Sequence, residues 1–179
     1  MSVPIRGDGF RLRRATADDA DFLLELAGHE DVEPFLRAVR ATDRDELLAE
    51  IEASLSAPEE SGRFVIEVEA DGEWRRAGVM GYDLQNRRNR IANLGGLAVH
   101  PDFRGRRLAD DAARLLQRHL LLDLDFHRLQ LEIYGFNARA IEHAERCGFV
   151  REGVNRKAYW RHGEWVDGVL FGLVREDLD

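Results

Sequence analysis

The spacing of apolar residues changes from strand-like to helix-like near the start of the chain. Phe10 to Arg14 alternate enough to predict a first strand, and Thr16 to Asp19 have the polar spacing of a helix N-cap. The helical face that follows is formed by Ala20, Leu23, Leu24 and Ala27. A second helix is expected to start at Thr42 and stop near Pro58, with an inward face of Leu47, Leu48, Ile51 and Leu55. Two amphipathic helices therefore precede the main sheet.

Strand-like segments follow in the middle of the chain. Phe64, Ile66 and Val68 alternate with acidic residues, which predicts a strand with one solvent-exposed face. Asp71-Gly72 is expected to turn the chain into a strand over Ala77 to Leu84, and a second turn leads into Ile91 to Val99. The result is three consecutive strands joined by hairpins.

The C-terminal part returns to helical spacing and then to strands. A long helix is expected from the shared face of Leu108, Ala112, Leu115, Leu116 and Leu120. The strand Leu129 to Ile133 comes after this crossover, so it can pair parallel to the strand before the helix. Asn137 is suited to cap the next helix, Gly148 to end it, and Val150 to Val174 to form a terminal hairpin.

Together these elements predict an α/β fold with a mixed, mostly antiparallel central sheet, one β-α-β crossover and helices on both faces. The 179 residues, of which 44% are hydrophobic, are enough for one well-buried core, so we expect a single domain over 1–179. Apolar runs are too short for a membrane span and no signal peptide is visible, which predicts a cytoplasmic protein that binds no membrane.

Charge and cysteine content narrow the function classes. A net charge of −8 argues against a nucleic-acid binder, because such affinity rests on basic patches that neutralise phosphates. Arginines nevertheless cluster at Arg104 to Arg107. The single cysteine, Cys147, lies on the apolar face of a predicted helix, so we expect inert core packing and not a nucleophile.

The arginine cluster lies between a strand and a helix. Leu94 to Val99 is ended by Pro101, the basic turn follows, and a helix starts within it. The first N–H groups of a helix are unpaired and lie at the positive end of its dipole, so this loop is suited to a phosphate group. The sequence predicts an anionic ligand here.

The same loop carries a family resemblance. Arg104-Gly105-Arg106-Arg107-Leu108-Ala109 resembles the Q/R-x-x-G-x-G/A pyrophosphate loop of the GNAT (GCN5-related) N-acetyltransferases. Asn137 to Ile141, then Cys147-Gly148-Phe149 and Arg151-Glu152-Gly153, resemble a later region of that family. The closing stretch is most similar to the branch that acetylates ribosomal-protein N-termini and polyamines. One departure is Arg107, where the loop usually has glycine.

The resemblance implies acetyl transfer from acetyl-CoA to an amine by direct attack in a ternary complex. It implies that backbone groups of Leu97, Ala98 and Val99 bind pantetheine, and that Arg104, Gly105, Arg106, Arg107, Leu108 and Ala109 bind the pyrophosphate. Asn137 has two possible roles, helix cap and partner of the pantetheine arm. Arg107 is expected to have ordinary helix-entry backbone angles, and its outward side chain to bind the pyrophosphate or the 3′-phosphate.

Two proton-transfer groups of the family are absent. Asn93 stands where a glutamate often acts as base, and Ala144 stands where a tyrosine often protonates the thiolate. Glu132 and Tyr134, at the end of the second parallel strand, are the remaining catalytic candidates, although a structural role is open for each. The histidines, His143 included, have no metal-ligand spacing with one another or with Cys147, so we expect no metal.

Several alternatives stay open at this point. A non-catalytic acyl-CoA sensor or interaction module would also explain Asn93 and Ala144, whereas a P-loop nucleotidase lacks its Gly-Lys-Ser/Thr ending. The acceptor amine is a protein N-terminus, a polyamine or another small molecule. The acidic segment His29 to Val39 is either a receiver for a cationic substrate or an ordinary loop. A homodimer is possible.

Overall fold

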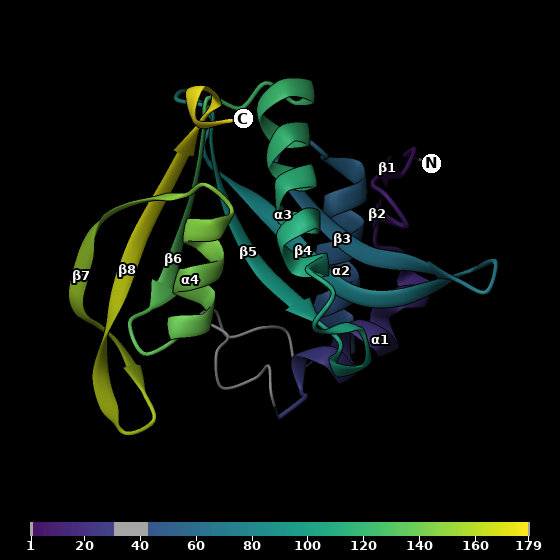
Figure 1. The fold of residues 1–179 in the computed structure, drawn as a ribbon, viewed down its shortest axis with the longest axis horizontal. Helices are drawn as coiled ribbons and strands as arrows, with labels where there is room; N and C mark the ends of the chain where they lie inside the picture. The colour runs from purple at the N-terminus through teal and green to yellow at the C-terminus, as the bar shows by residue number, and fades with distance from the viewer. Residues whose placement is uncertain (1, 31–42, 179) are drawn as a thin grey trace.

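The computed structural model describes residues 2–30 and 43–178 (Figure 1). Its strands are β1 (Ile5–Arg6), β2 (Phe10–Arg14), β3 (Ser61–Ala70), β4 (Glu73–Asn86), β5 (Ile91–Val99), β6 (Arg128–Tyr134), β7 (Val150–Arg161) and β8 (Glu164–Val174). Its α-helices are α1 (Ala20–Ala27), α2 (Arg44–Ser56), α3 (Leu108–Arg118) and α4 (Ala138–Arg146). Short 3-10 turns flank them at Ala17–Asp19, Pro101–Phe103 and Arg175–Asp177, and a π turn, His119–Asp123, extends α3.

The strands form one sheet of eight in the order β1-β2-β3-β4-β5-β6-β8-β7. Neighbours pair antiparallel except β5 and β6, which pair parallel across the α3 crossover. The predicted mixed sheet with one β-α-β unit is therefore confirmed.

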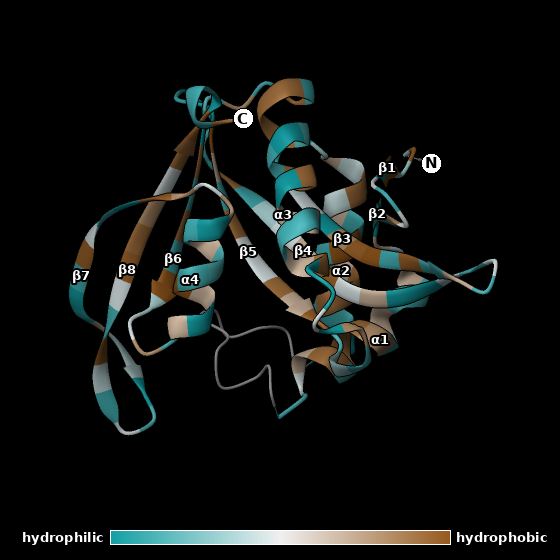
Figure 2. Ribbon diagram, in the orientation of Figure 1, coloured by the Kyte–Doolittle hydropathy of each residue, from teal (hydrophilic) through white to brown (hydrophobic). Residues whose placement is uncertain are grey.

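Helices cover both faces of this sheet, as predicted. One face packs on α1 and α2 through small clusters around Val65, Val79, Ile51 and Leu26. The other face carries the main core, to which α3 contributes Leu108, Ala112 and Leu116, and α4 contributes Ala144 and Cys147. Figure 1 shows α3 and α4 in front of the sheet, and Figure 2 shows that they turn mainly hydrophilic residues to the viewer.

Helix α2 differs from its prediction in two details. It begins at Arg44 with Asp43 as its cap, and the Asp43 carboxylate accepts the N–H of Asp45 at 3.0 Å. Leu55 was expected to face inward and is instead 46% exposed. Ser54 is buried in its place because its hydroxyl accepts the N–H of Arg63 at 2.8 Å. Thr42 lies outside the described residues, and so do residues 31–39 of the acidic segment His29 to Val39.

Candidate active site between β5 and β6

The parallel ladder between β5 and β6 is short. Within the described residues it joins only Ile91–Asn93 to Arg128–Gln130. Beyond Asn93 the two strands diverge, as Figure 1 shows at the lower end of β5. Among the remaining residues of β5, Leu94, Gly95, Ala98 and Val99 pair with β4, and the ladder with β6 does not extend to them. Their backbone groups on the other side are therefore directed toward the opening.

The end of β5 is irregular, as strands beside active sites often are. Its register with β4 slips opposite Met80, and Gly96 in the slipped segment has a φ of 68°. The Ala98 carbonyl points at β4, since a Cβ added to Gly78 would lie 2.5 Å from it. Backbone groups alternate along a strand, so those of Leu97 and Val99 point to the opening. The Val99 carbonyl accepts a hydrogen bond from Arg104 Nε at 3.1 Å.

The loop after β5 ends in a left-handed turn. Gly105 has a φ of 81°, and Arg107, the residue before α3, has φ 58° and ψ 12°. The expectation that Arg107 has ordinary helix-entry angles is therefore wrong. Arginine here adopts the conformation that glycine adopts without strain, at a cost of roughly 1 kcal/mol. Its side chain and that of Arg106 are exposed beside the first turn of α3.

Asn137 lies at the start of α4, near the divergent end of β6. Its side-chain oxygen accepts the N–H of Ala140 at 3.1 Å, which confirms its role as the helix cap. Gly148 ends the same helix with a φ of 89°, also as predicted. The cap interaction uses the Asn137 oxygen and leaves the amide NH₂ as the donor for any ligand.

Glu132 and Tyr134 lie on the face of β6 opposite to α3 and α4. Leu129, Leu131 and Ile133 pack against the main core, and side chains alternate along a strand, so Glu132 and Tyr134 point the other way. The Glu132 carboxylate accepts hydrogen bonds from Tyr159 Oη at 2.6 Å and Asn155 Nδ2 at 3.1 Å. These two partners were not predictable from the sequence, because they lie on β7, which follows β6 only after helix α4.

Tyr134 is enclosed by other side chains. It is 2% exposed, its ring stacks on Phe136 at 5.2 Å between centroids, and it meets Tyr159 edge-on at 5.5 Å. The Arg161 guanidinium lies 5.7 Å from the Tyr134 ring centroid. The two catalytic candidates therefore belong to one aromatic and acidic cluster formed by β6 and β7.

A family profile described as an acetyltransferase (GNAT) domain matches residues 10–150. The chain belongs to the GNAT acetyltransferase family. A curated relative, the SPbeta prophage-derived uncharacterised N-acetyltransferase YokL of Bacillus subtilis (strain 168), is 32% identical over 83 residues. That match covers 46% of this chain and 47% of the relative, so the aligned region spans about half the length of that protein.

Two solved acetyltransferase structures share the fold over almost the whole chain. Spermidine N-acetyltransferase from Vibrio cholerae, in complex with CoA and spermine, superposes with a TM-score of 0.85 at 19% identity, covering 96% of this chain and 99% of that one. Ribosomal-protein-S5-alanine acetyltransferase from Vibrio fischeri gives 0.81 at 14% identity, covering 99% and 100%. The fold of the suspected branch is thereby confirmed.

The GNAT positions that are altered in this chain lie apart from one another. Ala144 is 1% exposed in the main core, so it offers no acid. Asn93 pairs with Gln130 in the parallel ladder. Its neighbours Ala92 and Leu94 point into the main core, so Asn93 points to the face of the sheet opposite to that core. Residues paired across neighbouring strands point to the same face. Glu132, two residues after Gln130, therefore places a carboxylate on the face where Asn93 has none.

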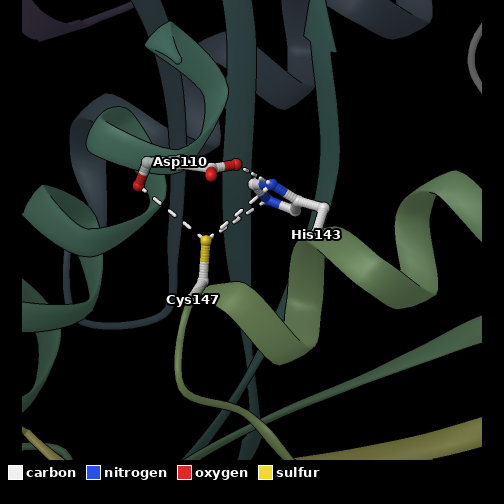
Figure 3. Close-up of side chains that lie close together, drawn as sticks. All are labelled: Asp110, His143 and Cys147. Atoms are coloured by element: carbon white, nitrogen blue, oxygen red, sulfur yellow. Dashed lines mark hydrogen bonds and ion pairs between the residues drawn. The ribbon is translucent and has the colours of Figure 1, made fainter.

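Between α3 and α4 this GNAT chain also assembles a group that the sequence analysis missed. Asp110, His143 and Cys147 bring their ligand atoms within 4.8 Å of one another (Figure 3). Asp110 accepts from His143 Nδ1 at 2.7 Å and from Arg146 Nε at 3.0 Å, and the Arg146 hydrogen bond is the main cause that lowers the pKa of Asp110 to about 2. His143 and Cys147 are four residues, or one helical turn, apart, so the expectation that no histidine has metal-ligand spacing with Cys147 is wrong. Asp110 comes from a different helix, α3.

The chemistry of this group does not favour a metal ion. The Arg146 guanidinium already neutralises the Asp110 carboxylate. Burial raises the pKa of the Cys147 thiol to about 11, which disfavours the thiolate that a metal requires. Cys147 is 4% exposed in the main core, so the prediction of inert packing fits, and the absence of a metal stays a prediction.

Proposed function

We propose that the protein is an acetyl-CoA-dependent N-acetyltransferase that acts on amines by direct attack in a ternary complex. The observation that carries this proposal is the end of β5, which parts from β6 and leads through a left-handed turn into the N-terminus of α3. The family match over residues 10–150 supports the same reaction class. The acetyl donor supplies a thioester, whose thiolate is a good leaving group.

The residues around this strand end fit the donor. Outward backbone groups of Leu97 and Val99, with Ala98 holding the strand to β4, would bind the pantetheine arm, together with the Asn137 amide. The phosphates would lie at the first N–H groups of α3, where the helix dipole is positive. The loop that surrounds them consists of Arg104, Gly105, Arg106, Arg107, Leu108 and Ala109. Arg106 and Arg107 add exposed positive charge beside that helix end.

Glu132 would accept a proton during the reaction, and Tyr134 would donate one. The acceptor amine must lose a proton to attack, and Glu132 is a carboxylate on the same face of the sheet as Asn93. As the nitrogen bonds to the acetyl carbon, the bond from that carbon to sulfur breaks, and Tyr134 would return a proton to the departing thiolate. The Tyr134 ring is held by Phe136 and Tyr159, so its hydroxyl has a defined direction.

The acceptor is proposed to be a polyamine or a protein N-terminus. Both are cationic amines at neutral pH, and a protein of net charge −8 attracts such substrates. The structural neighbours support these two classes by their own reactions: one was solved with spermine and another is described as an S5-alanine acetyltransferase. A nucleic-acid partner is not proposed. Within 2–30 and 43–178, no helix is long and apolar enough to cross a membrane.

Self-association is part of the proposal. Trp160 and Trp165 form an edge-to-face pair on the β7–β8 hairpin and are 59% and 55% exposed. Exposed aromatic residues of this size are typical of contact surfaces. A structural neighbour, spermidine N-acetyltransferase from Vibrio cholerae, is described as dodecameric. We propose that residues 1–179 act as one domain in a homodimer, which light scattering after gel filtration measures directly.

A second candidate function is a non-catalytic acyl-CoA-binding module, which the identities of Asn93 and Ala144 favour. Both candidates predict binding of acetyl-CoA. At about 100 times Kd the ligand should add roughly 2.7 kcal/mol to the free energy of unfolding, which is visible as a thermal shift. Only the enzyme releases CoA thiol when it is given spermidine, spermine or a peptide that begins with alanine.

The two readouts separate the candidates. A thermal shift with CoA release from any of these amines supports the transferase. A thermal shift without release across the panel supports the binding module. No shift at millimolar acetyl-CoA and CoA contradicts both.

A further inference from the structure

Tyr159 is held against Glu132 by an irregularity in β7. The register of β7 on β8 slips between Asn155, which pairs with Gly168, and Tyr159, which pairs with Val166. Three residues of β7, 156–158, therefore lie opposite a single residue of β8, Asp167. Lys157, within the slipped segment, has a φ of 50°, and its N–H donates to Asp167 Oδ1 at 2.8 Å. The Asp167 side chain thus holds the bulge in place.

This bulge makes Asn155 and Tyr159 converge. Residues four apart in a regular strand are separated by about 13 Å, which is too far for both side chains to reach one carboxylate. Opposite the bulge the separation is set by two residues of β8, or about 7 Å. Asn155 donates to Glu132 Oε1 and Tyr159 to Glu132 Oε2, so each carboxylate oxygen has its own donor. Bulges beside active sites commonly direct a side chain in this way.

Gly168 completes the arrangement from β8. A Cβ at this position would lie 2.0 Å from Glu132 Oε1 and 2.9 Å from Tyr159 Cε2. The carboxylate therefore rests on the glycine backbone, in space that any larger residue would occupy. The Tyr159 ring is fixed in turn by its edge-to-face contact with Tyr134.

We infer that Tyr159 is a positioning residue, which holds the Glu132 carboxylate toward the acceptor amine, and that Gly168 provides the space for this. The inference rests on the proposed function, because it gives Glu132 the role of proton acceptor. It goes further in assigning the acceptor side of the site to the β7–β8 hairpin. The alternative is that the hydrogen bonds only stabilise the hairpin.

A double-mutant cycle separates positioning from stability. Tyr159→Phe keeps the ring and removes the hydroxyl, and we expect kcat/KM for the amine to fall about 10-fold, with the Kd of acetyl-CoA unchanged. If Tyr159 acts through Glu132, the same change made in a Glu132→Gln background causes no further fall. Independent falls that multiply would overturn the inference.

Gly168→Ala tests the same idea without removing a hydrogen-bonding group. Displacement of the carboxylate by about 1 Å is expected to lower kcat/KM about 100-fold. Gly172→Ala, in the same strand as Gly168, is the matched control, because its Cβ would meet the ion pair between Arg128 of β6 and Glu152 of β7, away from Glu132. Equal falls in activity for the two glycine variants, at equal unfolding midpoints, would also overturn the inference.

The failure of the inference is distinguishable from that of the proposed function. Wild-type turnover that survives Glu132→Gln unchanged removes Glu132 as a base and the inference with it, while the transferase stands. Absence of CoA release by the wild type with all amines removes both. Turnover lost on Glu132→Gln and unaffected by Tyr159→Phe removes the inference alone.

Discussion

Two carboxylates in this protein are held in opposite ways on opposite faces of the sheet. Asp110 lies between α3 and α4, 7% exposed, and is bound by His143 and the cationic Arg146. Glu132 lies on the other face, only partly buried, and is held by the neutral donors Tyr159 and Asn155. A carboxylate paired with a guanidinium resists protonation, as the low pKa of Asp110 indicates.

The difference assigns the two faces to different tasks. The Asp110 group fixes the helix whose N-terminus is proposed to bind phosphate, and it is not suited to accept a proton near neutral pH. The Glu132 group is oriented by hydrogen bonds and is open in part to a substrate. We therefore expect changes at Asp110 to affect stability first and changes at Glu132 to affect turnover first.

The largest expected effect is that of Glu132→Gln. Amide for carboxylate removes the proton acceptor and keeps the size, so kcat should fall about 100-fold or more, with little change in the Kd of acetyl-CoA. Steady-state kinetics and isothermal titration measure the two quantities. Glu152→Gln is the control, because it breaks the ion pair between Glu152 of β7 and Arg128 of β6 and leaves Glu132 unchanged. This variant should keep its kcat. A normal kcat in Glu132→Gln would contradict the assignment of turnover to Glu132 and of stability to Asp110.

The next effect is on stability and depends on pH. The folded-state pKa of Asp110 is about 2, below its ordinary value of 3.8, so its ionised form stabilises the fold by about 2 kcal/mol above pH 4. This contribution is lost as the pH falls from about 4 to about 2. Asp110→Asn should therefore have a lower free energy of unfolding by about 2 kcal/mol at pH 7, and a smaller deficit near pH 2.5.

Urea unfolding at both pH values measures this deficit. Asp111→Asn is the control, because Asp111 is an exposed neighbour in the same helix turn whose nearest cation, Arg114, is 3.7 Å away. Its effect should stay within about 0.5 kcal/mol at both pH values. A deficit for Asp110→Asn that does not shrink in acid would show that packing, and not charge, dominates.

A smaller effect is expected at Arg107, whose backbone conformation costs stability while its side chain is proposed to strengthen CoA binding. Arg107→Gly relieves the left-handed strain and should be about 0.5 to 1 kcal/mol more stable than Arg107→Ala. Both variants lose the charge, so both should bind CoA several-fold more weakly at low salt. Dephospho-CoA distinguishes the 3′-phosphate from the pyrophosphate as the partner. If Arg107→Gly binds CoA as tightly as the wild type, the arginine has no such role.

The smallest effect is expected from metal ions. A zinc ion held by Asp110, His143 and Cys147 at 100 times its Kd would add about 2.7 kcal/mol to stability. We expect neither Zn²⁺ nor EDTA to change the melting temperature, because Arg146 occupies the carboxylate and the thiol stays protonated. A clear rise with Zn²⁺, abolished in Cys147→Ala, would contradict this expectation.

Elements with a strong apolar period were predictable from the sequence, and their irregular ends were not. The period gave the order of strands and helices, and the cap chemistry of Asn137 and Gly148 gave the limits of α4. The left-handed angle of Arg107 was missed because loop closure, and not the preference of arginine, imposes it. Leu55 was misplaced because hydrogen bonding favours burial of Ser54.

The candidate site shows the same division. Glu132 and Tyr134 were predictable because they adjoin the end of a recognisable strand. Their partners were not, since the approach of Tyr159 and Asn155 to Glu132 depends on a bulge in β7 that no single residue predicts. Asp110 and His143 are likewise 33 residues apart and lie in different helices, and a spacing pattern within one helix contains no information about the other.

The three-residue ladder between β5 and β6 also has a mechanical consequence. It is a narrow seam between two half-sheets that are each contiguous in the chain, β1 to β5 and β6 to β8. Backbone amides near a short seam are the first to lose protection when a protein opens locally. Hydrogen exchange should therefore be faster at Ile91 to Asn93 than in the long β3–β4 pairing, and a ligand that bridges both half-sheets should slow it.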